Sequence, residues 1–382
     1  MKCNEEATKV NAIIQNKISS KQLRFGVDKC VQIHVGGNKS SCSNLKVQGE
    51  DMKKGEKDKY LGDILTHDGK ITNNIEERKG KGFGAANQIV SMLQEISFGH
   101  SYFEMAMLFR TSIMINSMLC SSEALYGINK THVDKLEESD KYLMRRIFDV
   151  GTGCPIMSVY LETGAIPMRF VLIGRRLMYL WSILQKTDIE LVRKVYNSQK
   201  MFPVKDDWVI QIAKDLDECE IEFDEQNIST MSKYRFKKLV NERIYRLALS
   251  YISEERKNKD GTYKTKLENL SIWKMQDYLV SDQLLLSEKR LLFKIRTQMV
   301  ELKANFKCKY GESLQCSLCG EHLEDQKSLL TCKEIVSDLD TSEINYSDIY
   351  GNLDRQVKAV KIWKQILKIR SHKLKHRSLT FL

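Results

Sequence analysis

The fold is decided by the run between residues 72 and 96, which reads TNNIEERKGKGFGAANQIVSMLQEI. Thr72 or Asn73 can act as the N-cap of a helix, and Glu76 stands where the acidic residue of a capping box belongs. The apolar side chains beyond the cap share one face of a helical wheel, which indicates a helix packed on a core. They are Ile75, Ile89, Met92, Leu93 and Ile96.

Helical spacing continues after this run. Thr131 and Asp134 repeat the capping-box spacing at the start of a further helix, and the Met and aromatic residues before it are typical of core packing. With only 3 prolines and 20 glycines in 382 residues, long helices are favoured over a turn-rich all-β fold. The expected helices cover 101–126, 131–150 and 167–185, followed by more polar helices to about residue 300 with loops at 224–229 and 257–261.

The segment before Thr72 carries a different pattern. Glu5 to Ile18 has apolar residues at helical spacing and predicts a first helix that ends near Ser19. Short β-like segments follow, and turn residues separate them. We expect strands at 23–25, 30–35 and 60–65. The fold class predicted for the whole chain is therefore mainly α with a small N-terminal α+β region.

Charge and cysteine usage limit the class of protein. Lys and Arg total 61 against 50 Asp and Glu, which leaves a formal net charge of +11. No stretch has the length and apolarity of a membrane span, and the N-terminus lacks the apolar core of a signal peptide. Ten cysteines without such a signal are typical of reduced thiols. We expect an intracellular protein, cytoplasmic or nuclear, with no membrane partner.

Positive charge is concentrated in two places. Residues 355–382 contain no acidic residue, and basic side chains there, including Lys364, Lys368 and Arg370, accompany an apolar helical stripe. Such a basic amphipathic helix suits nucleic-acid phosphates, an anionic membrane face or a calmodulin-like groove, or it is a solvated packing helix. The second concentration is Arg78, Lys79 and Lys81 among three glycines that would let a backbone approach a phosphate. Its spacing is not that of a known nucleotide-binding loop.

A cysteine cluster near the C-terminus predicts a metal site. Cys316 and Cys319 have the C-x-x-C spacing with which two thiolates grip one tetrahedral zinc ion. Cys332 and His322 would complete four ligands, with Cys308 as a conceivable substitute for the histidine. The alternative is a degenerate site or a chance group of free thiols, because Lys327 occupies the place of a more conventional histidine. A redox motif is disfavoured, since no βαβ unit surrounds it.

An acidic pair, Asp206-Asp207, could hold Mg²⁺ for phosphoryl transfer. Because it follows Pro203 and precedes a helix-like run, an N-cap is the favoured interpretation. The remaining histidines are scattered singly, so no catalytic triad or dyad can be argued from them.

The order of these segments resembles the C-terminal half of a non-LTR retrotransposon reverse transcriptase. Leu23 to Cys30 is similar to polymerase motif D, which ends in a lysine, and Lys59 to Leu65 is similar to the primer-grip strand of motif E. Segments similar to the thumb helices of the family are Glu123 to Gly127, Leu136 to Asp140, Tyr160 to Pro167 and Gly174 to Leu180. The cysteine cluster stands where the family carries a C-terminal zinc knuckle.

The resemblance implies a domain plan and roles for particular residues. Lys29 would be an accessory catalytic residue near the departing pyrophosphate, and Tyr60, Leu61 and Gly62 would press the primer end. RNA, DNA or an RNA–DNA hybrid would be the partner, with Mg²⁺ bound only in a full-length enzyme. The implied parts are a palm remnant (1–70), thumb (71–185), helical connector (186–305), zinc-knuckle-like cluster (306–335) and basic tail (336–382).

The sequence departs from this family at its catalytic core. Reverse transcriptases hold two Mg²⁺ ions on palm carboxylates that include a Tyr-x-Asp-Asp turn, and neither this turn nor Phe-x-Asp-Asp occurs here. We therefore expect a reverse transcriptase fragment that retains primer- and template-binding parts but has no polymerase activity alone. The alternatives are a non-catalytic helical nucleic-acid-binding adaptor and a pseudogene product that does not fold stably.

Overall fold

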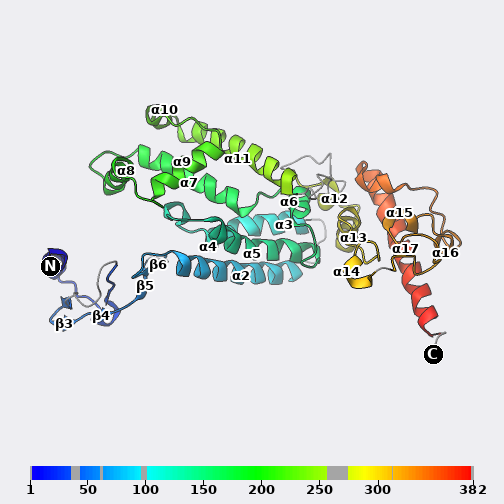
Figure 1. Ribbon diagram of the computed structural model, residues 1–382, viewed down its shortest axis with the longest axis horizontal. Coiled ribbons are helices and arrows are strands. Elements are labelled where there is room, and N and C mark those ends of the chain that lie inside the picture. The colour runs from blue at the N-terminus through cyan, green and yellow to red at the C-terminus, as the bar shows by residue number, and fades with distance from the viewer. Residues whose placement is uncertain are drawn as a thin grey trace.

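The computed structural model describes residues 2–35, 44–60, 63–95, 101–255, 274–311 and 313–379. It is 63% helical and 5% strand, which confirms the mainly α class. The molecule is elongated, with the strands at one end, a helical body in the middle and a second group of helices around the C-terminus at the other end (Figure 1).

The N-terminal segment holds one helix and three two-stranded pieces of sheet. The predicted helix is confirmed as α1 (Lys2–Ser19). Parallel β1 (Val31–Gln32) and β4 (Lys53–Lys54) pair, as do antiparallel β2 (Lys46–Val47) with β3 (Glu50–Asp51) and β5 (Lys57–Tyr60) with β6 (Asp63–Thr66). Among the described residues before Ile71, Val47 and Thr66 are the only buried ones.

One strand prediction in this segment was wrong, and two were confirmed only in part. Residues 23–25 are not a strand, residues 30–35 contain only the two-residue β1, and residues 60–65 contain parts of β5 and β6 because Tyr60 pairs with Asp63. Strand propensity becomes a stable strand only when one face is buried, and little is buried here. Leu61 and Gly62 lie outside the described residues.

The helical body begins where the sequence predicts. Helix α2 (Thr72–Glu95) packs along α5 (Lys130–Phe148) (Figure 1). Gly82 lies at the contact. A Cβ atom at Gly82 would lie 2.3 Å from Ser139 Oγ, so the glycine lets the two helices approach closely. This glycine of the basic run therefore serves helix packing.

The helix predicted at 101–126 is interrupted. It consists of α3 (Tyr102–Phe109), a π-helical turn (Arg110–Ile115), α4 (Asn116–Met118) and a 3-10 turn (Ser122–Ala124). Buried Arg110 in the π turn donates two hydrogen bonds to Asp140 and one, 2.8 Å long, to the Ile166 carbonyl. The cap of α5 also differs from the prediction, because Asn129 and His132 form the capping box.

The first hydrophobic core contains residues of α2, α3 and α5, and a second one lies among the helices drawn above them in Figure 1. Helix α7 (Met168–Leu184) confirms the predicted helix at 167–185. In the second core it packs against α8 (Leu191–Met201), α9 (Trp208–Glu218), α10 (Glu225–Thr230) and α11 (Lys233–Glu255). The loop predicted at 224–229 was wrong, because the Asp224 side chain caps α10 by accepting from the backbone of Gln226 and Asn227. The loop predicted at 257–261 lies outside the described residues.

Asp207 stands at the N-cap position of α9, as the favoured interpretation predicts. Its carboxylate, however, accepts a 2.7 Å hydrogen bond from the Val204 backbone instead of from a helix N–H. The pair thus shapes the turn before α9.

The C-terminal helices share the first core with the helical body. Helices α12 (Asp277–Val280), α13 (Leu286–Arg296) and α17 (Leu353–Leu379) contribute to it. In α17, Val360, Trp363 and Ile366 are completely buried, so its apolar face is already covered. The predicted boundaries at 305/306 and 335/336 fall within this core. Short elements stand between: α14 (Lys307–Tyr310), α15 (Gln326–Leu329), α16 (Lys333–Val336) and a 3-10 turn (Tyr346–Tyr350).

No single described helix has the length and apolarity to cross a membrane. The bent pair α6 (Ile156–Thr163) and α7 meets those requirements only when the two are joined across a 60° bend.

Candidate metal centre and basic surfaces

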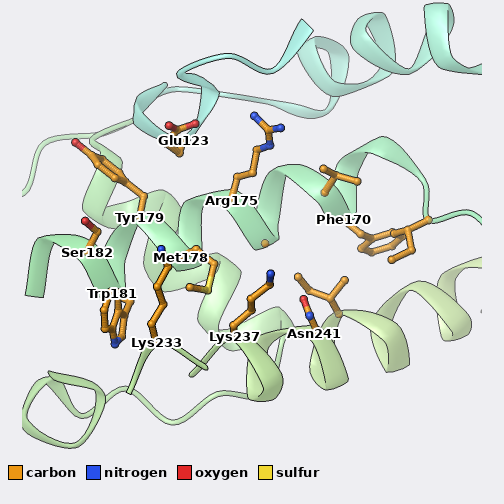
Figure 2. A pocket seen from close by; sticks show the side chains of 14 residues that line it. Glu123, Phe170, Arg175, Met178, Tyr179, Trp181, Ser182, Lys233, Lys237 and Asn241 are labelled. Atoms are coloured by element: carbon orange, nitrogen blue, oxygen red, sulfur yellow. The ribbon is translucent and has the colours of Figure 1, made fainter. Parts of the chain in front are cut away.

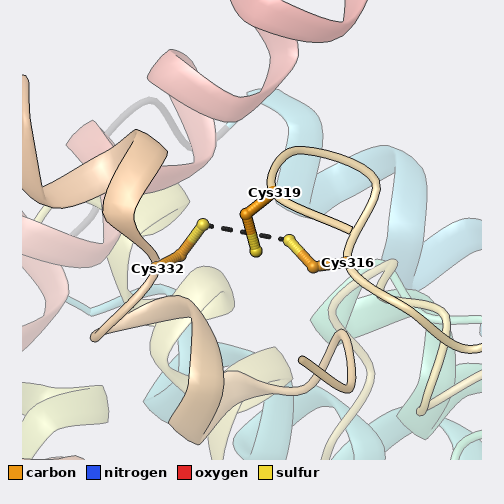
Figure 3. A group of neighbouring side chains, drawn as sticks. All are labelled: Cys316, Cys319 and Cys332. Carbon is orange, nitrogen blue, oxygen red and sulfur yellow. Dashed lines mark hydrogen bonds between the residues drawn. The ribbon is translucent and has the colours of Figure 1, made fainter. Parts of the chain in front are cut away.

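Three cysteine sulfurs converge in the C-terminal part of the molecule (Figure 3). Cys316 and Cys319 lie on a loop between α14 and α15 that a β-bridge between Gln315 and Leu323 closes, and Cys332 is the N-cap residue of α16. All three sulfurs lie within 4.8 Å of one another, and Cys316 Sγ is 3.9 Å from Cys332 Sγ. Gly320 adopts a positive φ of 71° directly after Cys319, which reverses the loop.

Backbone N–H groups point at all three sulfurs. The Leu318 N–H donates to Cys316 Sγ at 3.4 Å, those of Glu321 and His322 donate to Cys319, and that of Glu334 donates to Cys332. Hydrogen bonds of this kind stabilise thiolates and orient them toward a metal.

The acidities of the thiols reflect burial and these bonds. Desolvation raises the pKa of Cys332 to about 12. At Cys319 desolvation acts in the same direction, but the backbone donors outweigh it and the pKa falls below its ordinary value.

The sulfur geometry fits a tetrahedral thiophilic ion. Zinc–sulfur bonds of about 2.3 Å place two ligand sulfurs about 3.8 Å apart, close to the separation of Cys316 and Cys332. The residues present can therefore supply three ligands.

The structure does not bring the predicted fourth ligand to the cysteines. His322 is exposed and does not belong to the convergent group; its backbone carbonyl accepts the Cys316 N–H at 2.6 Å, and its backbone N–H donates to Cys319. Because His322 follows Cys319 by only three residues, its backbone is part of the turn that closes the cysteine loop. Cys308 is also exposed and outside the group.

Ion pairs on α17 neutralise much of the predicted basic tail. Arg370 pairs with buried Glu324, and Lys364 Nζ lies 2.9 Å from Glu288. Lys364 remains 54% exposed and can still reach a ligand. Arg370 is only 16% exposed, and its charge is taken up by Glu324. Lys361 and Lys368 are exposed and make no ion pair in the described part of the chain.

The other predicted basic patch is largely internal. Arg78 is buried, and its guanidinium bonds to Asp63, Asn74 and the carbonyls of Met118 and Cys120, so it cannot contact a phosphate. This corrects the prediction for Arg78. Lys79 pairs with Glu138, and Lys81 pairs with Glu77 at 3.3 Å.

Two further predicted residues lie in the N-terminal segment. Lys29 ends a 3-10 turn and is exposed, and Tyr60 at the end of β5 is 65% exposed. Neither side chain makes a hydrogen bond or ion pair within the described ranges. Their roles stay predictions.

One basic run escaped the sequence analysis. Residues 233–238 read KYRFKK, and Lys233, Arg235, Lys237 and Lys238 are all exposed without an ion pair to any described residue. Tyr234 among them is 78% exposed. Basic residues interleaved with aromatic ones, without acidic neighbours, are the signal that could have found it.

The chain matches no protein-family model, no curated protein and no solved structure. Functional conclusions therefore rest on the residues and geometry of this chain.

Proposed function

We propose that this protein binds the phosphate backbone of nucleic acid, as RNA, DNA or an RNA–DNA hybrid, through the exposed face of α17. The observation that carries the proposal is a stripe of lysines on that face. Lys361, Lys364 and Lys368 follow one another at three- and four-residue steps, and Lys375 continues the stripe two turns further on. All four are exposed.

The stripe has the dimensions of a backbone contact. Seven residues separate Lys361 from Lys368, which is a rise of about 10 Å along the helix, and Lys375 adds about 10 Å more. The opposite face is fixed in the core by Trp363 and its neighbours, so the lysines keep one orientation toward solvent. Cations arrayed on a rigid element bind phosphates without sequence preference.

The loop that carries the cysteine cluster is connected to α17. We propose that Cys316, Cys319 and Cys332 hold zinc, which would crosslink two loops, with a fourth ligand from outside this group. Glu324 connects this centre to α17, because its carboxylate accepts both the Ser317 N–H at 2.7 Å and the Arg370 guanidinium. Folding of the cysteine loop and positioning of the basic helix are therefore coupled.

For the origin of the chain we propose a fragment of a non-LTR retrotransposon reverse transcriptase. The order of the motifs supports this, and Lys29 and Tyr60 would then act beside an active site whose Mg²⁺-binding carboxylates this sequence lacks. The fragment alone has no polymerase activity. Templated primer extension with Mg²⁺ or Mn²⁺ tests this, and incorporation that Lys29→Ala abolishes would overturn it. A non-catalytic adaptor would share the binding activity.

Nucleic-acid binding is tested by fluorescence anisotropy with labelled RNA, DNA and hybrid at several salt concentrations. Replacing Lys361, Lys364 and Lys368 by Gln should lower the slope of log K against log salt by about 2 to 3, since each phosphate contact contributes about 0.7 to 0.9. The matched control replaces Lys186, Lys194 and Lys214, which are exposed away from α17. Equal losses in both triple variants, or a slope near zero for the unaltered protein, would contradict the proposal.

A further inference from the structure

Among the described residues, cations without an ion pair are densest at the N-terminal end of α11. Five cations of α17 are paired with acidic groups on other elements, whereas the four cations between residues 233 and 238 have no ion pair in the described chain. The paired set on α17 comprises Arg355, Lys358, Lys364, Arg370 and Lys373. Unpaired cations grouped on one turn of helix create a local positive potential.

A cavity of about 530 Å³ opens beside this charge, between α7 and α11 (Figure 2). Its floor is apolar and includes Phe170, Met178 and Ile244. Gly174 sets its width, because a Cβ atom there would lie 2.9 Å from Ile244 Cδ1. The volume is in the range of small-molecule sites, which are mostly apolar with a few placed polar groups.

The charged groups of the cavity are mainly cationic. Lys233 and Lys237 stand one turn apart on α11, and Figure 2 shows their side chains extending toward α7. On the α7 side, the Arg175 guanidinium donates to the Leu119 carbonyl at 2.6 Å and to Asn116 at 2.7 Å, and these two hydrogen bonds hold its positive charge in place. Glu123 is the one carboxylate among the residues that line the cavity.

We propose that this groove binds a nucleotide unit, with its phosphate at Lys233 and Lys237 and its base against the apolar floor. A ligand that suits the groove carries a compact anion at one end and a flat apolar surface at the other, and a nucleotide combines both. An acidic peptide fits less well, because its backbone amides would need polar partners that the floor does not offer. The unit belongs either to a free nucleotide or to a single strand.

If the unit belongs to a single strand, the inference rests on the proposed nucleic-acid binding and adds a second contact to it. If it belongs to a free nucleotide, the inference is independent of that proposal. The experiment therefore titrates the full chain with uridine 5′-monophosphate, ribose 5-phosphate and an acidic peptide, and crosslinks it to an oligouridylate that carries 4-thiouridine. The variant is Lys233→Gln with Lys237→Gln. The control is Lys361→Gln with Lys368→Gln, which removes the same charge from α17. Circular dichroism confirms that both variants keep their fold.

We expect the groove variant to bind uridine 5′-monophosphate about tenfold more weakly, with the control unchanged. Ribose 5-phosphate should bind more weakly than the nucleotide. For a single strand, crosslinks should map to peptides of α7 and α11 and be lost in the groove variant. Nucleotide binding through the groove without any crosslink to the oligonucleotide supports the free-nucleotide source, and the salt dependence of oligonucleotide binding then tests the proposed function separately.

Other results would overturn the groove proposal. If oligonucleotide binding depends on α17 while the groove variant changes neither nucleotide affinity nor crosslinking, the inference fails and the proposed function stands. Tighter binding of the acidic peptide than of the nucleotide would make the groove a peptide site. No binding of any of these probes would overturn both proposals.

Discussion

Arginines that look like surface charge in the sequence hold the interior of this protein together. Arg110 pairs with Asp140, Arg176 with Asp215 and Arg296 with Glu162, all six side chains being buried. Each pair joins helices that are far apart in the sequence, as Arg296 in α13 and Glu162 in α6 are. Because breaking such a pair leaves a buried charge without a partner, each is sensitive to substitution. The net charge of +11 therefore does not identify which cations face solvent.

His132 gives α5 a pH-dependent cap. The Asn129 N–H donates to His132 Nδ1 at 3.4 Å, a bond that requires this nitrogen to be unprotonated. Burial, together with nearby Lys135, lowers the pKa of His132 below the ordinary 6.5, although a backbone hydrogen bond with Gly127 opposes this. Below about pH 6.5 the unfolded chain thus binds more protons than the folded one, and the stability from the neutral ring is lost as pH falls through the folded pKa.

We expect the free energy of unfolding to fall by about 0.5 kcal/mol through this residue between pH 7 and pH 5, at the low end of measured capping effects. The control is His132→Gln, since Gln at this position can accept the same bond and does not titrate. Urea unfolding at both pH values measures the difference. An identical pH response in the variant would show that His132 contributes nothing to it.

At the scale of elements, helices could be predicted where their apolar face is buried along its length. Apolar periodicity placed α2 and α7 within a few residues. It also placed α1, although the apolar residues of that helix are exposed. The strand predictions failed in whole or in part because the residues with a strand-like pattern do not pack against a hydrophobic core. The π-helical break after Phe109 was invisible, since it depends on Arg110 reaching Asp140 on another helix.

Only the part of the candidate site that depends on local sequence could be predicted. C-x-x-C spacing brings Cys316 and Cys319 together through local turn geometry, so a sequence reveals it. The positions of Cys332 and His322 depend on how the following helices pack, and only the cysteine points inward. Likewise, the sequence shows the charge of α17 but not its ion pairs with Glu288 and Glu324.

Metal binding should stabilise the C-terminal elements and α17 together. Zinc bound only to the folded state adds its binding free energy to stability, so chelation should lower the melting temperature by several degrees. We expect one Zn²⁺ or Co²⁺ per chain, with cobalt–thiolate absorption bands. Cys332→Ser should weaken cobalt binding and abolish the effect of chelator, whereas Cys308→Ser, at an exposed cysteine, should change neither. A chain that binds no Co²⁺, or binds it equally after Cys332→Ser, would contradict this assignment.

At the scale of the whole molecule, burial is distributed unevenly along the long axis in Figure 1. The three hydrophobic clusters draw all their buried members from Ile71 onward. Before Ile71, α1 is attached to β2 by hydrogen bonds from Asn11 and Gln15 to the Lys46 carbonyl, while its apolar residues Val10, Ile13 and Ile14 stay exposed. Segments with so few buried apolar contacts open at low free-energy cost.

Two buried aliphatic residues test whether the N-terminal segment and the helical body unfold separately. Val47 is 2% exposed and belongs to none of the three clusters, whereas Ile75 is completely buried in one that joins α2, α5 and α7. Ile75→Ala should lower the free energy of unfolding of the helical body by about 2 to 5 kcal/mol. Val47→Ala should leave the free energy of unfolding of the helical body unchanged, as measured by the helical signal in circular dichroism. The cavity that this substitution creates lies in the N-terminal segment, which adds little to the core of the helical body. A comparable loss from both substitutions would mean that the strands and helices unfold as one unit, and that contacts of the N-terminal segment carry stability that its exposed surface does not suggest.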